Sequence, residues 1–181
     1  MKRLLIAIIA LLTVTCSFAQ PRALGGYVSI FSDGVYYQHT IAESVFFEAQ
    51  LGLDNSTFVK FGPGADLSVN INFILASVPK NNRTTNFWYG IGLHGSYGLT
   101  GLYHPANDTN PFVGIALNLG FDISFNNHLQ FYTKWSPKFG KTWGLSNEYE
   151  SNPPTSTMVS QFDFAKAILG IIPEFGLAYS F

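Results

Sequence analysis

Two residues of this 181-residue chain have the types and spacing for nucleophilic chemistry. His94 and Ser96 stand two positions apart in the stretch "HGS", and side chains two apart on a strand point to the same face. An imidazole beside a serine hydroxyl is the minimal pair for hydrolysis through a covalent intermediate. No acidic residue is placed to complete a triad, so we keep this pair as an alternative and do not predict an enzyme.

The other histidines give no sign of metal chemistry. His39, His104 and His128 are scattered over the chain, and neither they nor His94 lie at metal-ligand spacing from a cysteine, an acidic residue or one another. We therefore expect no metal and no cofactor.

The N-terminus has the features of an export signal. Two basic residues precede an apolar stretch over residues 4–14, which is too short to span a bilayer. Residues 17–19, Ser-Phe-Ala, fit a small-x-small cleavage site. We expect residues 1–19 to be a cleaved signal peptide and residues 20–181 to form one domain. The alternative is an N-terminal membrane anchor.

Composition narrows the class further. Cys16 is the single cysteine, so the mature domain would have no disulfide, although a lipoprotein acylated at Cys16 is an alternative. Without Lys2 and Arg3 of the signal, the chain has eight basic and eleven acidic residues and no run of basic residues. This argues against nucleic acid as a binding partner. Aromatic residues make up 16% and charged residues only 12%, about half the charged share of a soluble domain. Much of the surface must meet something apolar.

The apolar residues alternate instead of forming long runs. In "PFVGIALNLGFDISF", residues 111–125, the odd positions are mostly large and apolar, whereas most even positions are small or polar. A period of two over this length predicts a strand. We expect eight strands, at approximately residues 23–31, 35–41, 44–53, 59–76, 86–98, 111–125, 128–139 and 165–181.

The two faces suggest an all-β fold, an eight-stranded antiparallel up-and-down transmembrane β-barrel. The polar face carries many glycines and few charges, which suits a crowded interior, and the large apolar face suits lipid. With an even number of strands, the connections alternate between the two ends of the barrel. The periplasmic turns would be 42–43, 77–85 and 126–127. The outer loops would be 32–34 with its Asp-Gly turn, 54–58, 99–110 and 140–164, and the two longest are candidate sites for a surface ligand.

The interior of an eight-stranded barrel is just wide enough for side chains to fill it, so we expect no water-filled channel. Charges inside must be paired or hydrogen-bonded. The alternation predicts a polar network in the lumen made of Glu48, Asp66, Asp122, Lys134, Lys166 and Glu174.

The ending "EFGLAYSF" resembles the C-terminal signal of bacterial outer-membrane β-barrels, with Glu174, Gly176, Tyr179 and the terminal Phe181 at the matching positions. The stretches "NFWYGIGLHGSYG" and "LQFYTKWSPKFG" are also similar to strands of small eight-stranded barrels of Gram-negative bacteria. The resemblance implies a protein of the outer membrane, in contact with its lipid. It also implies that the barrel assembly machinery reads the last strand. Pro173 departs from a regular strand because it cannot donate to the ladder.

These observations leave three candidate functions. The leading one is a non-enzymatic outer-membrane barrel with a structural, adhesion or surface-interaction role. The second is a lipid A-modifying enzyme, since His94 and Ser96 resemble the His-x-Ser of outer-membrane lipid A deacylases, although here the pair falls on the interior face. The third is a secreted soluble barrel that binds an apolar ligand with its large face inward.

Overall fold

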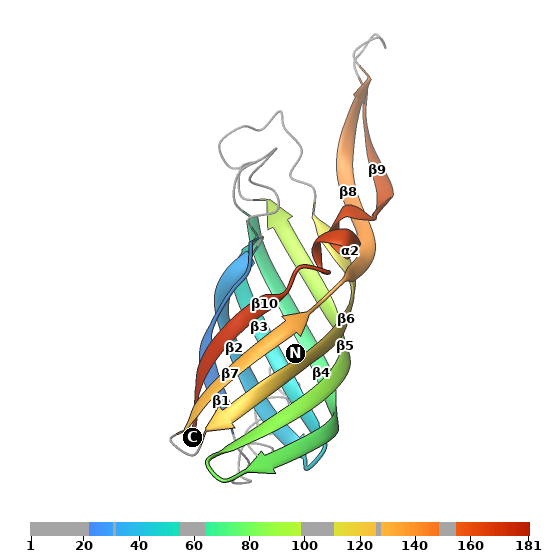
Figure 1. Ribbon diagram of the computed structural model, residues 1–181. Coiled ribbons are helices and arrows are strands. Elements are labelled where there is room, and N and C mark those ends of the chain that lie inside the picture. Colours follow the sequence, from blue (N-terminus) through green and yellow to red (C-terminus); the bar gives the residue numbers. More distant parts are fainter. Residues whose placement is uncertain (1–21, 31, 55–63, 99–110, 126–127, 149–154) are drawn as a thin grey trace, which may run out of the picture.

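The alternating segments form long strands, each paired with its neighbour along the wall (Figure 1). The computed structural model describes residues 22–30, 32–54, 64–98, 111–125, 128–148 and 155–181. Its elements are β1 (Arg22–Val28), β2 (Ser32–Ala42), β3 (Val45–Asp54), β4 (Gly64–Lys80), β5 (Arg83–Gly98), β6 (Phe112–Phe125), β7 (Leu129–Trp135), β8 (Lys138–Glu148), β9 (Thr155–Asp163), α2 (Ala165–Leu169) and β10 (Glu174–Ser180).

The sheet closes on itself through eight wall strands. Its order runs β5-β4-β3-β2-β1-β10-β7-β6, and an additional pairing of β5 with β6 completes the ring. All pairings are antiparallel, and β7 and β8 both pair with β6, one after the other, so together they make one wall strand with a break at Ser136 and Pro137. This confirms the predicted eight-stranded antiparallel up-and-down barrel.

The two ends of the barrel differ. Ala23 of β1 pairs with Ser180 of β10, so the described start and end of the chain meet at one end, which we call the terminal end. At the other end β8 pairs with β9 in a hairpin that projects beyond the barrel (Figure 1), and we call this the hairpin end. The short turns 43–44 and 81–82 lie at the terminal end.

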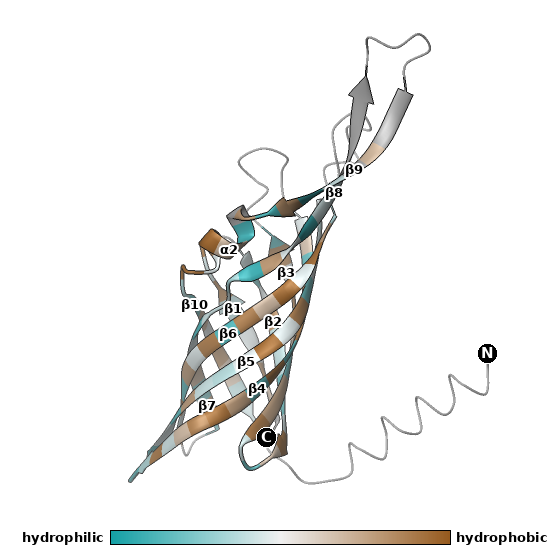
Figure 2. Ribbon diagram, turned by 90° about the vertical axis from the view of Figure 1, so that its right-hand side faces the viewer, coloured by the Kyte–Doolittle hydropathy of each residue, from teal (hydrophilic) through white to brown (hydrophobic). Residues whose placement is uncertain are grey.

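The outside of the barrel is apolar on every side. Each of the eight wall strands contributes a large apolar residue that is at least one third exposed, and Figure 2 shows how such residues alternate with polar ones along the strands. We call these residues the outer apolar belt: Leu24, Val35, Leu51, Ile71, Ile91, Leu117, Leu129 and Leu177. The inward positions between them carry most of the buried polar and charged side chains.

Two predicted turns were wrong. Asp33 and Gly34 lie inside β2, opposite Val28 and Tyr27. The turn comes earlier, where Ser29 N donates to Ser32 O at 2.7 Å and Ser32 N donates to Ser29 Oγ at 3.0 Å. This serine-closed turn takes the place of the expected Asp-Gly turn. The expected turn at 77–85 is also too long, because β4 and β5 continue pairing as far as Lys80 and Arg83.

The last quarter of the chain differs most from the prediction. Residues 140–164 are not simply a loop, since β8 and β9 form most of that stretch, and the strand expected over 165–181 begins only at Glu174. Residues 165–169, Ala-Lys-Ala-Ile-Leu, are favourable helix formers and make α2. Ser136 N donates to Gly170 O at 2.9 Å, which fixes the end of this helix beside the break between β7 and β8.

Several predictions fall outside the described residues: the signal peptide 1–19, most of the loop 54–58, the loop 99–110 and the turn 126–127. Within the described ranges, no helix is long and apolar enough to cross a lipid bilayer.

Candidate functional site

The centre of the lumen holds a buried lysine between two carboxylates. Lys134 of β7 has no exposed surface. Its Nζ lies 2.7 Å from Glu48 Oε1 of β3 and 2.9 Å from Glu174 Oε1 of β10. Strands on different sides of the barrel are therefore linked through one cation, and β10, the closing strand, is among them.

Neutral side chains complete the hydrogen bonds of these carboxylates. Gln50 Nε2 donates to Glu174 Oε1 at 2.5 Å and Tyr132 Oη donates to the same oxygen at 3.1 Å. Asn70 Nδ2 donates to Glu48 Oε1 at 3.0 Å. Buried charges of this kind persist when they are paired and hydrogen-bonded. We call this group the Lys134 network: Lys134, Glu48, Glu174, Gln50, Tyr132 and Asn70.

The structure brings together three of the six charges predicted for the lumen, Glu48, Lys134 and Glu174. Asp66 and Asp122 are also buried but lie outside the Lys134 network, and Lys166 lies on α2. Asp66 accepts a hydrogen bond from Tyr27 Oη at 3.3 Å. Asp122, near the terminal end, accepts from Asn86 Nδ2 at 2.9 Å and from Ser124 Oγ at 3.3 Å.

Lys166 was expected on a strand but is part of α2. Its Nζ lies 2.5 Å from Asp54 Oδ2, so the ion pair ties the helix to the end of β3. Asp54 was missed because the predicted strand stopped one residue short of it.

Large aromatic side chains fill the lumen around the Lys134 network. The rings of Tyr36 and Tyr132 meet edge to face with centroids 4.6 Å apart, and those of Phe46 and Trp88 do so at 5.3 Å. Gly176 lies opposite Tyr132 across the strand pair, and a side chain there would overlap the tyrosine ring. Gly176 thus has a packing reason to be glycine, whatever role it has in the C-terminal pattern.

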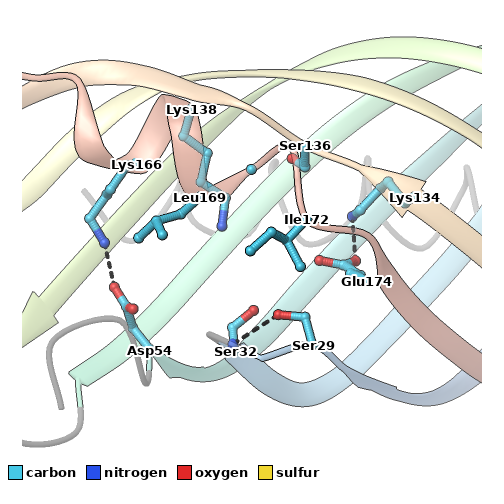
Figure 3. A pocket seen from close by; sticks show the side chains of 11 residues that line it. Ser29, Ser32, Asp54, Lys134, Ser136, Lys138, Lys166, Leu169, Ile172 and Glu174 are labelled. Carbon is cyan, nitrogen blue, oxygen red and sulfur yellow. Dashed lines mark hydrogen bonds and ion pairs between the residues drawn. The ribbon is translucent and has the colours of Figure 1, made fainter. Parts of the chain in front are cut away.

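Two cavities inside the barrel are lined by described residues. The cavity at the hairpin end measures about 40 Å³ and lies beneath α2 (Figure 3). The cavity toward the terminal end measures about 610 Å³ and is lined by polar side chains such as Asn86 and Asp122 together with apolar ones such as Phe46 and Ile74. Between them lie the Lys134 network and the aromatic pairs, so the lumen is not a continuous channel.

No hydrogen bond joins His94 to Ser96 in this structure. His94 is 2% exposed, and neither of its ring nitrogens has a hydrogen-bond partner. Its ring instead lies 5.8 Å from that of Phe112. Ser96 is half-buried and sits opposite Asp66 on the neighbouring strand.

Of the remaining histidines, one lies on β2, one directly before β7 and one outside the described residues. The rings of His39 and Tyr37 stack with their centroids 6.4 Å apart, and those of His128 and Tyr179 lie 5.6 Å apart. The backbone of His128 has a positive φ of 68°. His104 lies outside the described residues. Among the residues that the structure describes, no group of three or more His, Cys, Asp or Glu side chains could hold a metal ion.

Two of the four residues of the C-terminal pattern face the lumen and two face outward. Phe181 directly follows the last residue of β10. Glu174 and Gly176 are buried and face the lumen. Tyr179 and Phe181 are 58% and 61% exposed on the outside. The pattern therefore presents an aromatic edge outward while its acidic residue anchors the strand inside.

The fold and lumen define an eight-stranded antiparallel β-barrel with an apolar exterior and a polar, closed interior. No family model, no curated protein and no solved structure matches the chain.

Proposed function

We propose that this chain is an integral β-barrel protein of a bacterial outer membrane, without enzymatic activity and with a structural, adhesion or surface-interaction role. The observation that carries the proposal is the reversed distribution of polarity. Lys134, Glu48 and Glu174 are buried inside, whereas large apolar residues of every wall strand are exposed. Fractionation of cells that express the full chain tests the membrane location, because a barrel embedded in a bilayer requires detergent for its release whereas a soluble barrel does not.

The extent of the outer apolar belt favours lipid over a protein partner. Exposed apolar surface costs about 25 cal/mol per Å² in water, and soluble monomers rarely expose contiguous apolar patches beyond a few hundred Å². A partner protein would cover one side of the barrel. The belt runs over all eight wall strands, and a bilayer is the environment that covers a barrel on all sides.

The closed lumen supports a scaffold role and argues against a pore. The Lys134 network and the aromatic pairs occupy the space through which a solute would pass. What the barrel displays instead is the hairpin end, with β8 and β9 projecting beyond the wall (Figure 1). We assign surface interaction to this end, which in the proposed orientation faces outward.

The two alternatives fit the observations less well. A lipid A deacylase needs a serine and a histidine that reach a lipid, but His94 is buried in the lumen without a hydrogen-bond partner. A soluble barrel for an apolar ligand needs an apolar interior, but polar and charged side chains such as Asn70, Asn72 and Lys134 are buried there.

Deleting Phe181 should sharply reduce the amount of barrel in the outer membrane while export and signal cleavage continue. Phe181 is exposed at the end of β10, where it stabilises little of the interior, so the loss would come from failed recognition by the assembly machinery. Quantitative immunoblots of outer-membrane and periplasmic fractions measure it. The matched control, Phe181→Tyr, keeps a terminal aromatic and should assemble normally. Normal assembly of the deletion would show that the ending is not a signal.

A further inference from the structure

A shallow apolar groove lies on the outside of the barrel where its first and last wall strands meet. Its walls are formed by Val28 of β1, Phe175 and Leu177 of β10, and Phe131 of β7. The rings of Phe131 and Phe175 are stacked with their centroids 6.4 Å apart, and Val28 lies opposite Phe175 on the neighbouring strand. The groove measures about 330 Å³, and none of the described residues that line it is charged.

A glycine keeps this groove open. Gly26 lines it from the outward face of β1, where it lies opposite Leu177 of β10 and Val35 of β2. Both of these neighbours have large side chains on the same face, whereas Gly26 has none. A Cβ atom at Gly26 would make an ordinary van der Waals contact with Gly34 O at 3.5 Å and would meet no closer atom of another strand. The packing of the barrel therefore does not require glycine here, and its absence of a side chain shapes the outer surface alone.

Inside a bilayer, a groove of this kind is filled by a hydrocarbon chain. A void beside apolar side chains loses dispersion contacts, and ordered water needs polar partners that the side chains of these walls lack. A second copy of the chain needs about 800 Å² and roughly 20–30 residues on each side for a stable interface, far more than the few residues that line this groove. A single flexible chain is narrow enough to follow it, and Leu177 makes the groove continuous with the outer apolar belt.

We propose that this groove binds one acyl chain of a membrane phospholipid. The proposal rests on the membrane location proposed above and goes beyond it, because it assigns one place on the belt as a binding site for an individual lipid chain. The volume of about 330 Å³ is at the lower end of the roughly 300–1,000 Å³ that is typical of small-molecule sites. Because the described lining carries no charge, the groove recognises the chain and not the headgroup.

The test places the protein, purified after expression of the full chain, in vesicles that contain phosphatidylcholine with a photoreactive diazirine on one acyl chain. The labelled residues are mapped by mass spectrometry of peptides. We expect heavier labelling of Val28, Phe131 and Phe175 than of Ile71 and Ile91, which are exposed on β4 and β5 across the barrel. A phosphatidylglycerol probe should give the same pattern. Equal labelling of the two sets, or weaker labelling of the groove because a second copy covers it, would overturn the proposal.

Two matched leucine variants locate the effect. Gly26→Leu fills the groove from outside and should abolish the excess labelling of Val28 and Phe175, while the rest of the belt is labelled as before. Gly95→Leu adds the same side chain to an outward glycine of β5 that does not line the groove and whose Cβ atom would lie 3.8 Å from Phe112 O, so it should keep the excess. Both variants are checked for folding by their migration on a gel with and without boiling. Persistence of the excess in Gly26→Leu would contradict the groove, whereas a lack of labelling on groove and belt alike would contradict the membrane location as well.

Discussion

Replacing Lys134 with methionine should lower the free energy of unfolding by about 3–5 kcal/mol, because the removal of one partner leaves buried charges uncompensated. Glu48 and Glu174 would lose their shared cation, at 2.7 and 2.9 Å in the native barrel. Gln50 and Tyr132 would still donate hydrogen bonds to Glu174, but neither carries a charge. Equilibrium urea unfolding in lipid vesicles, followed by tryptophan fluorescence, measures the loss.

Two further variants show whether the loss comes from the ion network. Lys141→Met removes an exposed lysine from the outside of the barrel and should change stability by no more than about 0.5 kcal/mol. Adding Glu48→Gln and Glu174→Gln to Lys134→Met removes the uncompensated charges and should recover most of the loss. If Lys134→Met cost no more than Lys141→Met, the network would not hold the barrel together.

Leu117→Arg should cost about 2–4 kcal/mol in a bilayer, because it places a charge on the lipid-facing side near the midplane. Leu117 is 45% exposed in the middle of β6, opposite Ile91 of β5 and between Ile115 and Leu119 on the same face. On a surface in water, the same exposed replacement would be close to neutral. Unfolding in lipid vesicles therefore distinguishes the two environments.

The matched control for depth is Leu129→Arg. Leu129 is also exposed on the outside, but it is the first residue of β7, at the terminal end of the barrel. A charge near the interface should cost only about 0–1 kcal/mol. Equal and negligible costs for Leu117→Arg and Leu129→Arg would mean that the belt does not lie in lipid.

Strict alternation explains why most of the wall could be predicted from the sequence. In β6 the large residues Val113, Ile115, Leu117 and Leu119 are all exposed, while the positions between them are buried. A period of two encodes both the strand and its two faces, and the low share of charged residues indicates which face is outside. The predicted position of the first turn was wrong because the side chain of Ser29 closes an earlier turn through a local hydrogen bond. This bond outweighed the preference of Asp-Gly for a turn.

The contacts inside the lumen could not be predicted in the same way. Alternation shows that Glu48, Lys134 and Glu174 face inward, but which of them meet depends on strand tilt and register, and these are properties of the closed barrel. Trp88 was missed because it is a large apolar residue on the otherwise small face of β5, and it fills the lumen against Phe46. The alternation along β5, which places Trp88 on the inward face, was the one feature of the sequence that could have identified it.

The segment from β9 to α2 was missed for a physical reason of its own. Residues 165–172 are mainly apolar without alternation, which fits a buried strand as well as a short helix. Pro173 cannot donate a ladder hydrogen bond, and β10 begins directly after it. The helix is fixed by tertiary contacts, the bond from Ser136 to Gly170 and the ion pair of Lys166 with Asp54, which no local pattern encodes.

The most direct test of the central claim is the extraction of the protein from cells that express the full 181-residue chain. Membranes are washed with alkaline carbonate and then treated with detergent, and the extract is run on a gel with and without boiling. We predict that the protein stays in the outer-membrane fraction through the wash, is released by detergent, and migrates differently when unboiled, as a folded barrel. Recovery from the periplasm or the culture fluid without detergent would contradict the account.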